Sequence, residues 1–225
     1  LDSADPATRV RAVEGISSGP PGDAAPLLMI ALADSDARVR DAAGRALASI
    51  PGEALMESVV GVLGWGDPTV ARAVGAALPT LRNALEAPLL ARFESHESPR
   101  VERMAAAYCL GRIGSARSGP RLVEEVWGDD LVLALYCADA LASIDDPGLL
   151  REHVRMASHP RVQMRVAAYR GLARTGGDEA RRALLEAASG RAERDTSARK
   201  TAIRLLAYVP NDEVVEFLMG LVRAD

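Results

Sequence analysis

The sequence predicts an all-α fold, a right-handed α-solenoid built from about seven copies of a two-helix repeat. Of the 225 residues, 48% are apolar but only 4% are aromatic. The core must therefore consist of Ala, Leu, Val and Ile, which suits closely packed helices. No alternation of apolar and polar residues persists as a half-buried strand would need. Apolar residues instead recur with a period of about 31 residues, which is typical of repeat architectures.

Each copy of the repeat contains a large apolar residue, called the anchor here, near the end of a helix. Four residues before the anchor stands Ala, Val or Cys in every copy. Small residues at helical spacing beside a large one allow two helices to approach closely. The anchors are Ile16, Leu47, Leu78, Leu110, Leu141, Leu172 and Leu206.

The first three anchor helices are expected over residues 5–17, 36–50 and 67–82. Each begins at an Asp, whose carboxylate can accept backbone N–H groups and suits the positive end of the helix dipole. Turn residues such as Pro51 and Gly52 stop the chain after the second of these helices.

The next four anchor helices are expected over residues 98–113, 129–144, 160–175 and 195–209. Pro or Asp lies at each of their starts, and Gly176-Gly177 ends the sixth. The polar segment 189–197 predicts a longer loop before the seventh.

Second, shorter helices fill the spaces between the anchor helices and complete seven helical hairpins. Pro and Gly at the joints mark their boundaries. Their predicted starts are near Asp23, Glu53, Leu85, Gly119, Pro147, Asp178 and Asn211.

Two charged columns accompany the repeat, one eleven and one seven residues before the anchor. An Arg four residues after an Asp lies on the same helix face, so it can pair with that Asp or with the Asp of the next repeat. We expect these side chains to form a structural ladder between repeats. Its members are Asp5, Asp36, Asp67, Asp130, Asp195, Arg9, Arg40, Arg103, Arg165 and Arg199.

This pattern resembles the HEAT-repeat family, in particular its short bacterial form, the bilin-lyase-type HEAT-like repeat. The resemblance is carried by "DARVRDAAGRALASIPG", "SPRVERMAAAYCLGRIG" and "HPRVQMRVAAYRGLARTGG", and the Asp and Arg columns match the family's ladder. It implies a single solenoid over residues 1–225, with the anchor helices on the concave side. Because the chain starts at Leu1 with an inner-type helix, we expect a fragment of a longer protein.

Charge and composition restrict the partners. The formal net charge is −4, which makes a nucleic-acid partner unlikely at the level of the whole chain. The anchor helices are relatively basic and the other helices acidic, which favours a protein partner with an acidic surface. No segment could span a membrane, and two cysteines without a CxxC motif indicate a reducing, cytoplasmic location. The oligomeric state stays open.

A candidate contact surface lies two residues before the anchor, where the residue type varies from copy to copy. This column should face the groove, and aromatic and basic residues are enriched in interface hot spots. We expect a concave patch formed by Tyr108, Tyr169, Arg170, Lys200, Arg204 and Arg45.

No residues combine into a catalytic site, so neither an enzyme, a cofactor nor a metal is expected. "GISSG" matches a nucleophile-elbow pattern but ends a helix instead of following a strand. His96-Glu97 does not recur from repeat to repeat, as a metal site of this family would require. Cys109 and Cys137 fall in small-residue columns that indicate packing, and Trp65 and Trp127 occupy turns where they are expected to cap corners.

The sequence therefore favours a non-catalytic protein–protein interaction scaffold. Two alternatives remain. One is a nucleic-acid-binding protein related to the HEAT-like alkyl-base DNA glycosylases. The other is a subunit of a bilin lyase, which rests on the resemblance alone.

Overall fold

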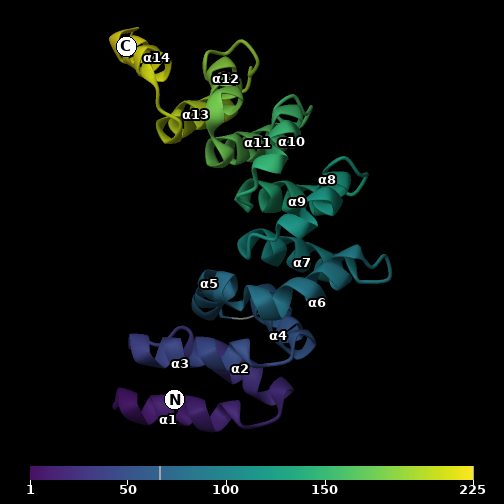
Figure 1. Cartoon of the computed structure of the whole chain (residues 1–225), viewed down its shortest axis with the longest axis vertical. Coiled ribbons are helices and arrows are strands. Elements are labelled where there is room, and N and C mark those ends of the chain that lie inside the picture. The colour runs from purple at the N-terminus through teal and green to yellow at the C-terminus, as the bar shows by residue number, and fades with distance from the viewer. Residues whose placement is uncertain (66, 225) are drawn as a thin grey trace. The chain divides into compact units, whose positions relative to one another are not determined.

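The computed structural model describes residues 1–65 and 67–224, and these residues contain helices and no strand (Figure 1). In chain order the α-helices of this part of the chain make seven successive pairs. The prediction of an all-α solenoid of two-helix repeats is confirmed. The chain divides into two compact units, Leu1–Ser115 (unit 1) and Ala116–Asp225 (unit 2). The expectation of a single domain over residues 1–225 stays a prediction.

Unit 1 contains seven α-helices and one 3₁₀ turn in its described residues. The helices of the anchor repeats alternate with the second helices. Helix α2 packs against α1 and α3, α4 against α5, and α6 against α7. The elements are α1 (Pro6–Ser17), α2 (Pro21–Ala31), α3 (Ala37–Ala48), α4 (Gly52–Trp65), α5 (Pro68–Ala77), η1 (Leu78–Leu81), α6 (Arg82–Glu94) and α7 (Arg100–Arg112).

Unit 2 repeats the same alternation, with short 3₁₀ turns at several joints. Its helices α9 and α11 carry anchors, whereas α13 ends one residue before the anchor Leu206, which lies in η4; the seventh anchor helix is therefore shorter than the expected 195–209. The three helices pack side by side. The elements are η2 (Ala116–Ser118), α8 (Gly119–Val126), α9 (Leu131–Ser143), η3 (Pro147–Leu149), α10 (Leu150–Met156), α11 (Val162–Thr175), α12 (Gly177–Ala188), α13 (Thr196–Leu205), η4 (Leu206–Tyr208) and α14 (Asp212–Ala224).

The third anchor helix is shorter than expected. We expected one helix over residues 67–82, but α5 ends at Ala77 and a 3₁₀ turn follows. Pro79 explains the difference, because it has no N–H to donate and its ring clashes with the preceding turn of an α-helix. The anchor Leu78 is nevertheless fully buried in this turn.

Candidate functional site

An open groove lies between α3 and α5 in unit 1, with a volume of about 760 Å³. We call it the α3–α5 groove. One face of each helix lines it, at spacings of three and four residues that follow the helical period. Its walls come from α3 at Arg40, Asp41, Gly44, Arg45 and Ala48, and from α5 at Thr69, Arg72, Ala73, Ala76 and Ala77.

The groove exists because α3 and α5 do not pack as tightly as their neighbours. Helices α1 and α3 run side by side, whereas α3 makes closer contact with η1 than with α5 (Figure 1). The side chains between α3 and α5 are small, including Gly44, Ala48 and Ala76. Small side chains cannot fill the space between two separated helices, so an apolar floor of alanines is left open to a ligand.

Three arginines and one aspartate line the α3–α5 groove. The Arg40 guanidinium is already engaged, since its Nη1 donates to the carbonyl oxygens of Asp34 (2.7 Å) and Ser35 (2.8 Å). Arg45 and Arg72 are exposed, and neither has a hydrogen-bond or ion-pair partner among the described residues. These two side chains are therefore available to bind an anion from opposite walls.

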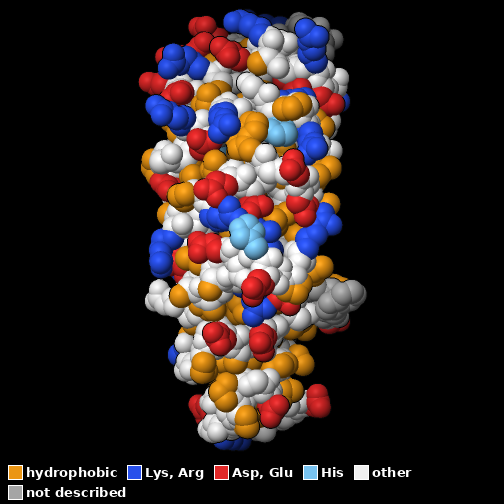
Figure 2. Space-filling view, turned by 90° about the vertical axis from the view of Figure 1, so that its right-hand side faces the viewer, with side chains coloured by type: hydrophobic (Ala, Val, Ile, Leu, Met, Phe, Trp, Pro, Cys, Tyr) orange, Lys and Arg blue, Asp and Glu red, His pale blue; other side chains and the backbone are white. Residues whose placement is uncertain are grey.

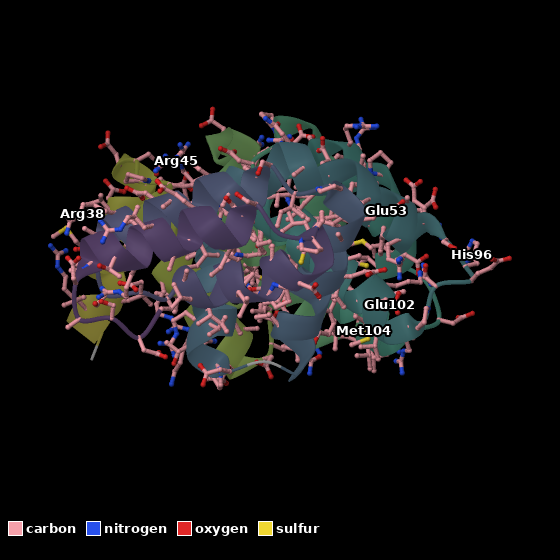
Figure 3. The ribbon with its side chains drawn as sticks, turned by 90° about the horizontal axis from the view of Figure 1, so that it is seen from below. Arg38, Arg45, Glu53, His96, Glu102 and Met104 are labelled. Atoms are coloured by element: carbon pink, nitrogen blue, oxygen red, sulfur yellow. The ribbon has the colours of Figure 1, made fainter. Side chains whose placement is uncertain are left out.

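On the side shown in Figure 2, basic and acidic side chains lie close together over the upper part, and acidic side chains predominate towards the lower end. In Figure 3, Arg38 and Arg45 of α3 lie at the periphery of the ribbon. Arg38 differs from Arg45 because it pairs with Asp36, its Nη2 lying 2.9 Å from the carboxylate.

The predicted concave patch is divided between the two units. Arg45 and Tyr108 belong to unit 1, and Tyr108 is 38% exposed beside Gly75. Arg170, Lys200 and Arg204 are exposed in unit 2. Arg170 forms an ion pair with Asp139, so its charge is already balanced.

Tyr169 does not belong to this surface, and its assignment to the patch is wrong. Its side chain is only 1% exposed and its hydroxyl donates a hydrogen bond of 2.8 Å to Glu193. Burial and the neighbouring Glu193 carboxylate raise the pKa of Tyr169 above its usual range. Tyr169 stands three residues before the anchor, and Arg170 stands two before it. That step of one residue turns a helical side chain from the buried face to the exposed face.

Four arginines of the ladder column donate hydrogen bonds to backbone carbonyl groups that precede their own helices. Nη1 of each of three arginines donates to carbonyl oxygens five and six residues earlier in the chain. These are Arg9, Arg40 and Arg165. Arg103 instead donates through Nε to the carbonyl of Phe93 (3.0 Å), and Arg199 lies beside Gly190.

The aspartate column caps the helices. The carboxylates of its five members accept backbone N–H groups in the first turns of α1, α3, α5, α9 and α13. These are Asp5, Asp36, Asp67, Asp130 and Asp195. Arg9 and Arg165 each also bind a carboxylate through two hydrogen bonds. That carboxylate does not belong to the aspartate column but to another position of the repeat, which the sequence analysis did not identify.

That position lies thirteen residues before the anchor and carries an acid in three repeats, as Asp34, Glu97 and Glu193. Arg9 binds Asp34 with two bonds of 2.8 Å, and Arg165 binds Glu193 with bonds of 2.7 and 2.8 Å. Each of these two acids also accepts the backbone N–H of the cap aspartate two residues later. The sequence did contain a signal for these ion pairs. In both cases an acid stands two residues before a cap aspartate, and the preceding repeat carries a ladder arginine.

These contacts determine the charge of the acids. The Arg9 guanidinium beside Asp34 lowers the pKa of that carboxyl. Burial opposes ionisation of Glu193, but its bonds from Arg165, Asp195 and Tyr169 together lower its pKa to about 2. Both acids are therefore ionised near neutral pH and act as structural partners.

The corner at the end of α8 is closed by Trp127, as expected. Its ring lies 4.9 Å from the His159 ring, and the Arg155 guanidinium carbon lies 4.2 Å from its centroid. A cation over an indole face is a favourable contact. The side chain of Trp65 lies outside the described residues.

Other candidate residues do not assemble into a reactive centre. His96 lies at the tip of the loop that joins α6 to α7 (Figure 3). In the described part of the chain, no group of three or more His, Cys, Asp or Glu side chains is placed to hold a metal ion. Both cysteines are buried, and burial raises the pKa of the Cys109 thiol to about 12. Within residues 1–65 and 67–224, no helix is long and apolar enough to cross a bilayer.

Comparison with known proteins identifies the repeat type. Residues 1–78 match HEAT repeats, and residues 102–125 match the PBS lyase HEAT-like repeat. No curated protein matches the sequence. One similar solved structure is the complex of CpcE and CpcF of phycocyanin lyase from Nostoc sp. PCC7120. It is 19% identical with a TM-score of 0.43, and the match covers 100% of this chain and 91% of that chain.

The match over residues 102–125 also corrects one prediction. We expected that the chain is not an enzyme, but this segment has the repeat type of a lyase, which contradicts that expectation. The absence of a recognisable catalytic motif in a repeat sequence was a poor guide, because the repeat residues are set by helix packing. Residues 1–78 are thus similar to HEAT repeats, and residues 102–125 to the PBS lyase HEAT-like repeat.

Proposed function

We propose that this chain is a subunit of a bilin lyase, which binds a bilin and acts together with another protein. The observation that carries the proposal is the match of residues 102–125, in α7 and α8, to the PBS lyase HEAT-like repeat. The partner would meet unit 2 at the position two residues before the anchor, where Asp139, Arg170 and Arg204 are all exposed.

The chemistry of unit 1 supports a bilin as the ligand. A bilin is an open-chain tetrapyrrole, with an extended apolar body and two propionate groups. The α3–α5 groove offers an alanine floor and two unpaired arginines, which match these two parts. Ligand sites commonly combine a mostly apolar lining with a few polar groups that fix orientation.

Co-expression tests the proposal. The full chain is produced in cells that make a bilin and a phycocyanin subunit without its own lyase, and it is then purified by a tag. We expect the chain to retain bilin colour, and the acceptor to gain bilin that survives denaturing electrophoresis once the partner subunit is also supplied. Cells that make no bilin are the control.

A purified chain that stays colourless and shows no induced circular dichroism at saturating bilin contradicts the proposal. Induced dichroism is the sharper readout, because free biliverdin interconverts between left- and right-twisted conformers in equal amounts, whereas a protein that binds it selects one hand.

A further inference from the structure

The α3–α5 groove differs from an ordinary packing gap in the state of its charged residues. Some other arginines of unit 1 have carboxylate partners; Arg38 pairs with Asp36 and Arg92 with Glu102. Arg45 and Arg72 lie on the two walls and have no such partner among the described residues. An unpaired guanidinium keeps its full donor fork for a carboxylate.

The floor between these arginines is suited to an apolar body. Leu32, Ala48, Ala73 and Ala76 contribute to it, and no lining residue is aromatic. A volume of about 760 Å³ falls within the range of small-molecule sites. The groove is thus large enough for a ligand of several rings, and too apolar to favour a simple inorganic anion.

We infer that the α3–α5 groove is the bilin site of this chain, with Arg45 and Arg72 each binding one propionate. This inference rests on the proposed function and adds the location and the residues. The alanine floor packs against the tetrapyrrole body. Asp41, the one carboxylate among the lining residues, disfavours an anion at its end of the groove and so restricts how the ligand can lie.

Arg72 was not part of the concave patch expected from the sequence. It lies one helical turn before Ala76, the exposed residue of the same repeat two positions before the anchor. A side chain four residues earlier covers the same helix face. Helical periodicity therefore places Arg72 on the same exposed face as Ala76, one turn earlier. The structure shows that both residues line the α3–α5 groove.

Titration of the purified full chain with biliverdin tests the inference, with visible absorption and induced circular dichroism as readouts. The variants are Arg45→Gln, Arg72→Gln and the double variant, in which a neutral side chain replaces each guanidinium. We expect binding to weaken about tenfold for each arginine removed, because each loses one charge-assisted interaction. Biliverdin dimethyl ester, which keeps the apolar body but not the charges, should bind wild type as weakly as the double variant binds biliverdin.

Two further variants separate binding from folding. Ala76→Phe fills the groove from an exposed position and leaves both arginines in place, so it should also abolish binding. Arg151→Glu is the control, since Arg151 is an exposed arginine of α10 in unit 2. It should bind biliverdin like wild type. Far-ultraviolet circular dichroism checks that every variant is folded.

The outcomes distinguish the inference from the proposed function. Biliverdin binding that survives in the double variant and in Ala76→Phe overturns the location, while the proposed function stands. A fluorescent fatty acid, a carboxylate with no tetrapyrrole, is the second probe. If it binds, depends on Arg45 and Arg72, and biliverdin does not bind, the groove is a carboxylate site and the proposed function fails. If neither probe binds, the inference is overturned.

Discussion

Arg45 in unit 1 and Arg170 in unit 2 occupy the same position of the repeat, and both are exposed. Arg170 is held in an ion pair by Asp139, which stands at the same position one repeat earlier. Arg45 has Glu14 and Ala76 at the neighbouring positions, and it forms no ion pair among the described residues. The helical period thus determines exposure, whereas the neighbouring repeat determines whether the charge is available to a ligand.

The grooves around these two arginines differ accordingly. The hollow at Arg170 has a volume of about 480 Å³ and includes Asp139 and Asp195 among its lining residues. Asp195 is occupied as a helix cap. The arginine of this hollow is therefore balanced by an ion pair, whereas Arg45 and Arg72 have no ion-pair partner among the described residues. The following predictions compare equivalent positions of the two units, from the largest expected effect to the smallest.

The largest effect is expected at Glu193 of unit 2. Replacing it by Ala leaves the Arg165 guanidinium and the Tyr169 hydroxyl without their acceptor in a site where the Glu193 side chain is 1% exposed. Removing one partner of a buried ion pair costs about 3 kcal/mol of unfolding free energy. Urea denaturation measures it. Asp34→Ala, at the same position of unit 1, should cost less because Asp34 is 11% exposed. Equal losses would contradict the difference between the units.

The second effect concerns His153 in α10, which is fully buried with neither ring nitrogen hydrogen-bonded. Burial lowers its pKa from 6.5 to about 4. Between these values the unfolded chain binds the proton and the folded chain does not, so stability falls as the pH falls. This shift corresponds to a loss of about 3 kcal/mol between pH 7 and pH 4.

His153→Met checks this pH dependence, because Met is flexible, apolar and cannot titrate. The difference in unfolding free energy between the variant and wild type should grow in favour of the variant as the pH falls to about 4, and then level off. Parallel stability curves from pH 7 to pH 4 would rule out His153 as the cause.

The third effect compares two glycines in the column one residue before the anchor. A Cβ at Gly171 would lie 2.4–2.6 Å from atoms of the His153 ring, whereas a Cβ at Gly15 would meet nothing within 4 Å. Gly171→Ala should therefore destabilise the protein by about 2 kcal/mol through overpacking. Gly15→Ala should stabilise it by up to about 1 kcal/mol, because alanine favours helix. Thermal unfolding measures the midpoint temperature of both variants. A change of the same sign in the two variants would contradict the prediction.

The smallest effect on stability is expected from Asp139→Ala. Asp139 and Arg170 are 62% and 48% exposed in their side chains, and exposed pairs contribute less than about 1 kcal/mol. The informative measurement is biliverdin titration, because the variant frees Arg170 and makes unit 2 more like unit 1. A weak second binding phase is expected. Unchanged binding together with a large loss of stability would show that this pair is structural.

Much of the fold follows from the sequence because packing repeats with the helix pair. The anchors, the small residues beside them and the cap aspartates recur at fixed spacing, and each acts within its own helix or against the next one. The shortened α5 and α13, each followed by a 3₁₀ turn, are the exceptions, and Pro79 was a local signal for the first. The candidate site was predicted less well. Arg45 was identified, Arg72 was not, and Tyr169 was placed on the wrong face.

The sequence by itself determined the helix pairs, their caps and the exposed column, because these depend on residues at most one repeat apart. The tertiary structure decided where the helices separate and which charges stay unpaired. The period of the repeat is the same around α5 and around α11. Helix α11 nevertheless packs against α9 and α13, whereas α3 packs against η1 instead of α5 and so leaves the α3–α5 groove open. A cavity and a free charge depend on three-dimensional distances between side chains of different repeats, and periodicity does not specify those distances.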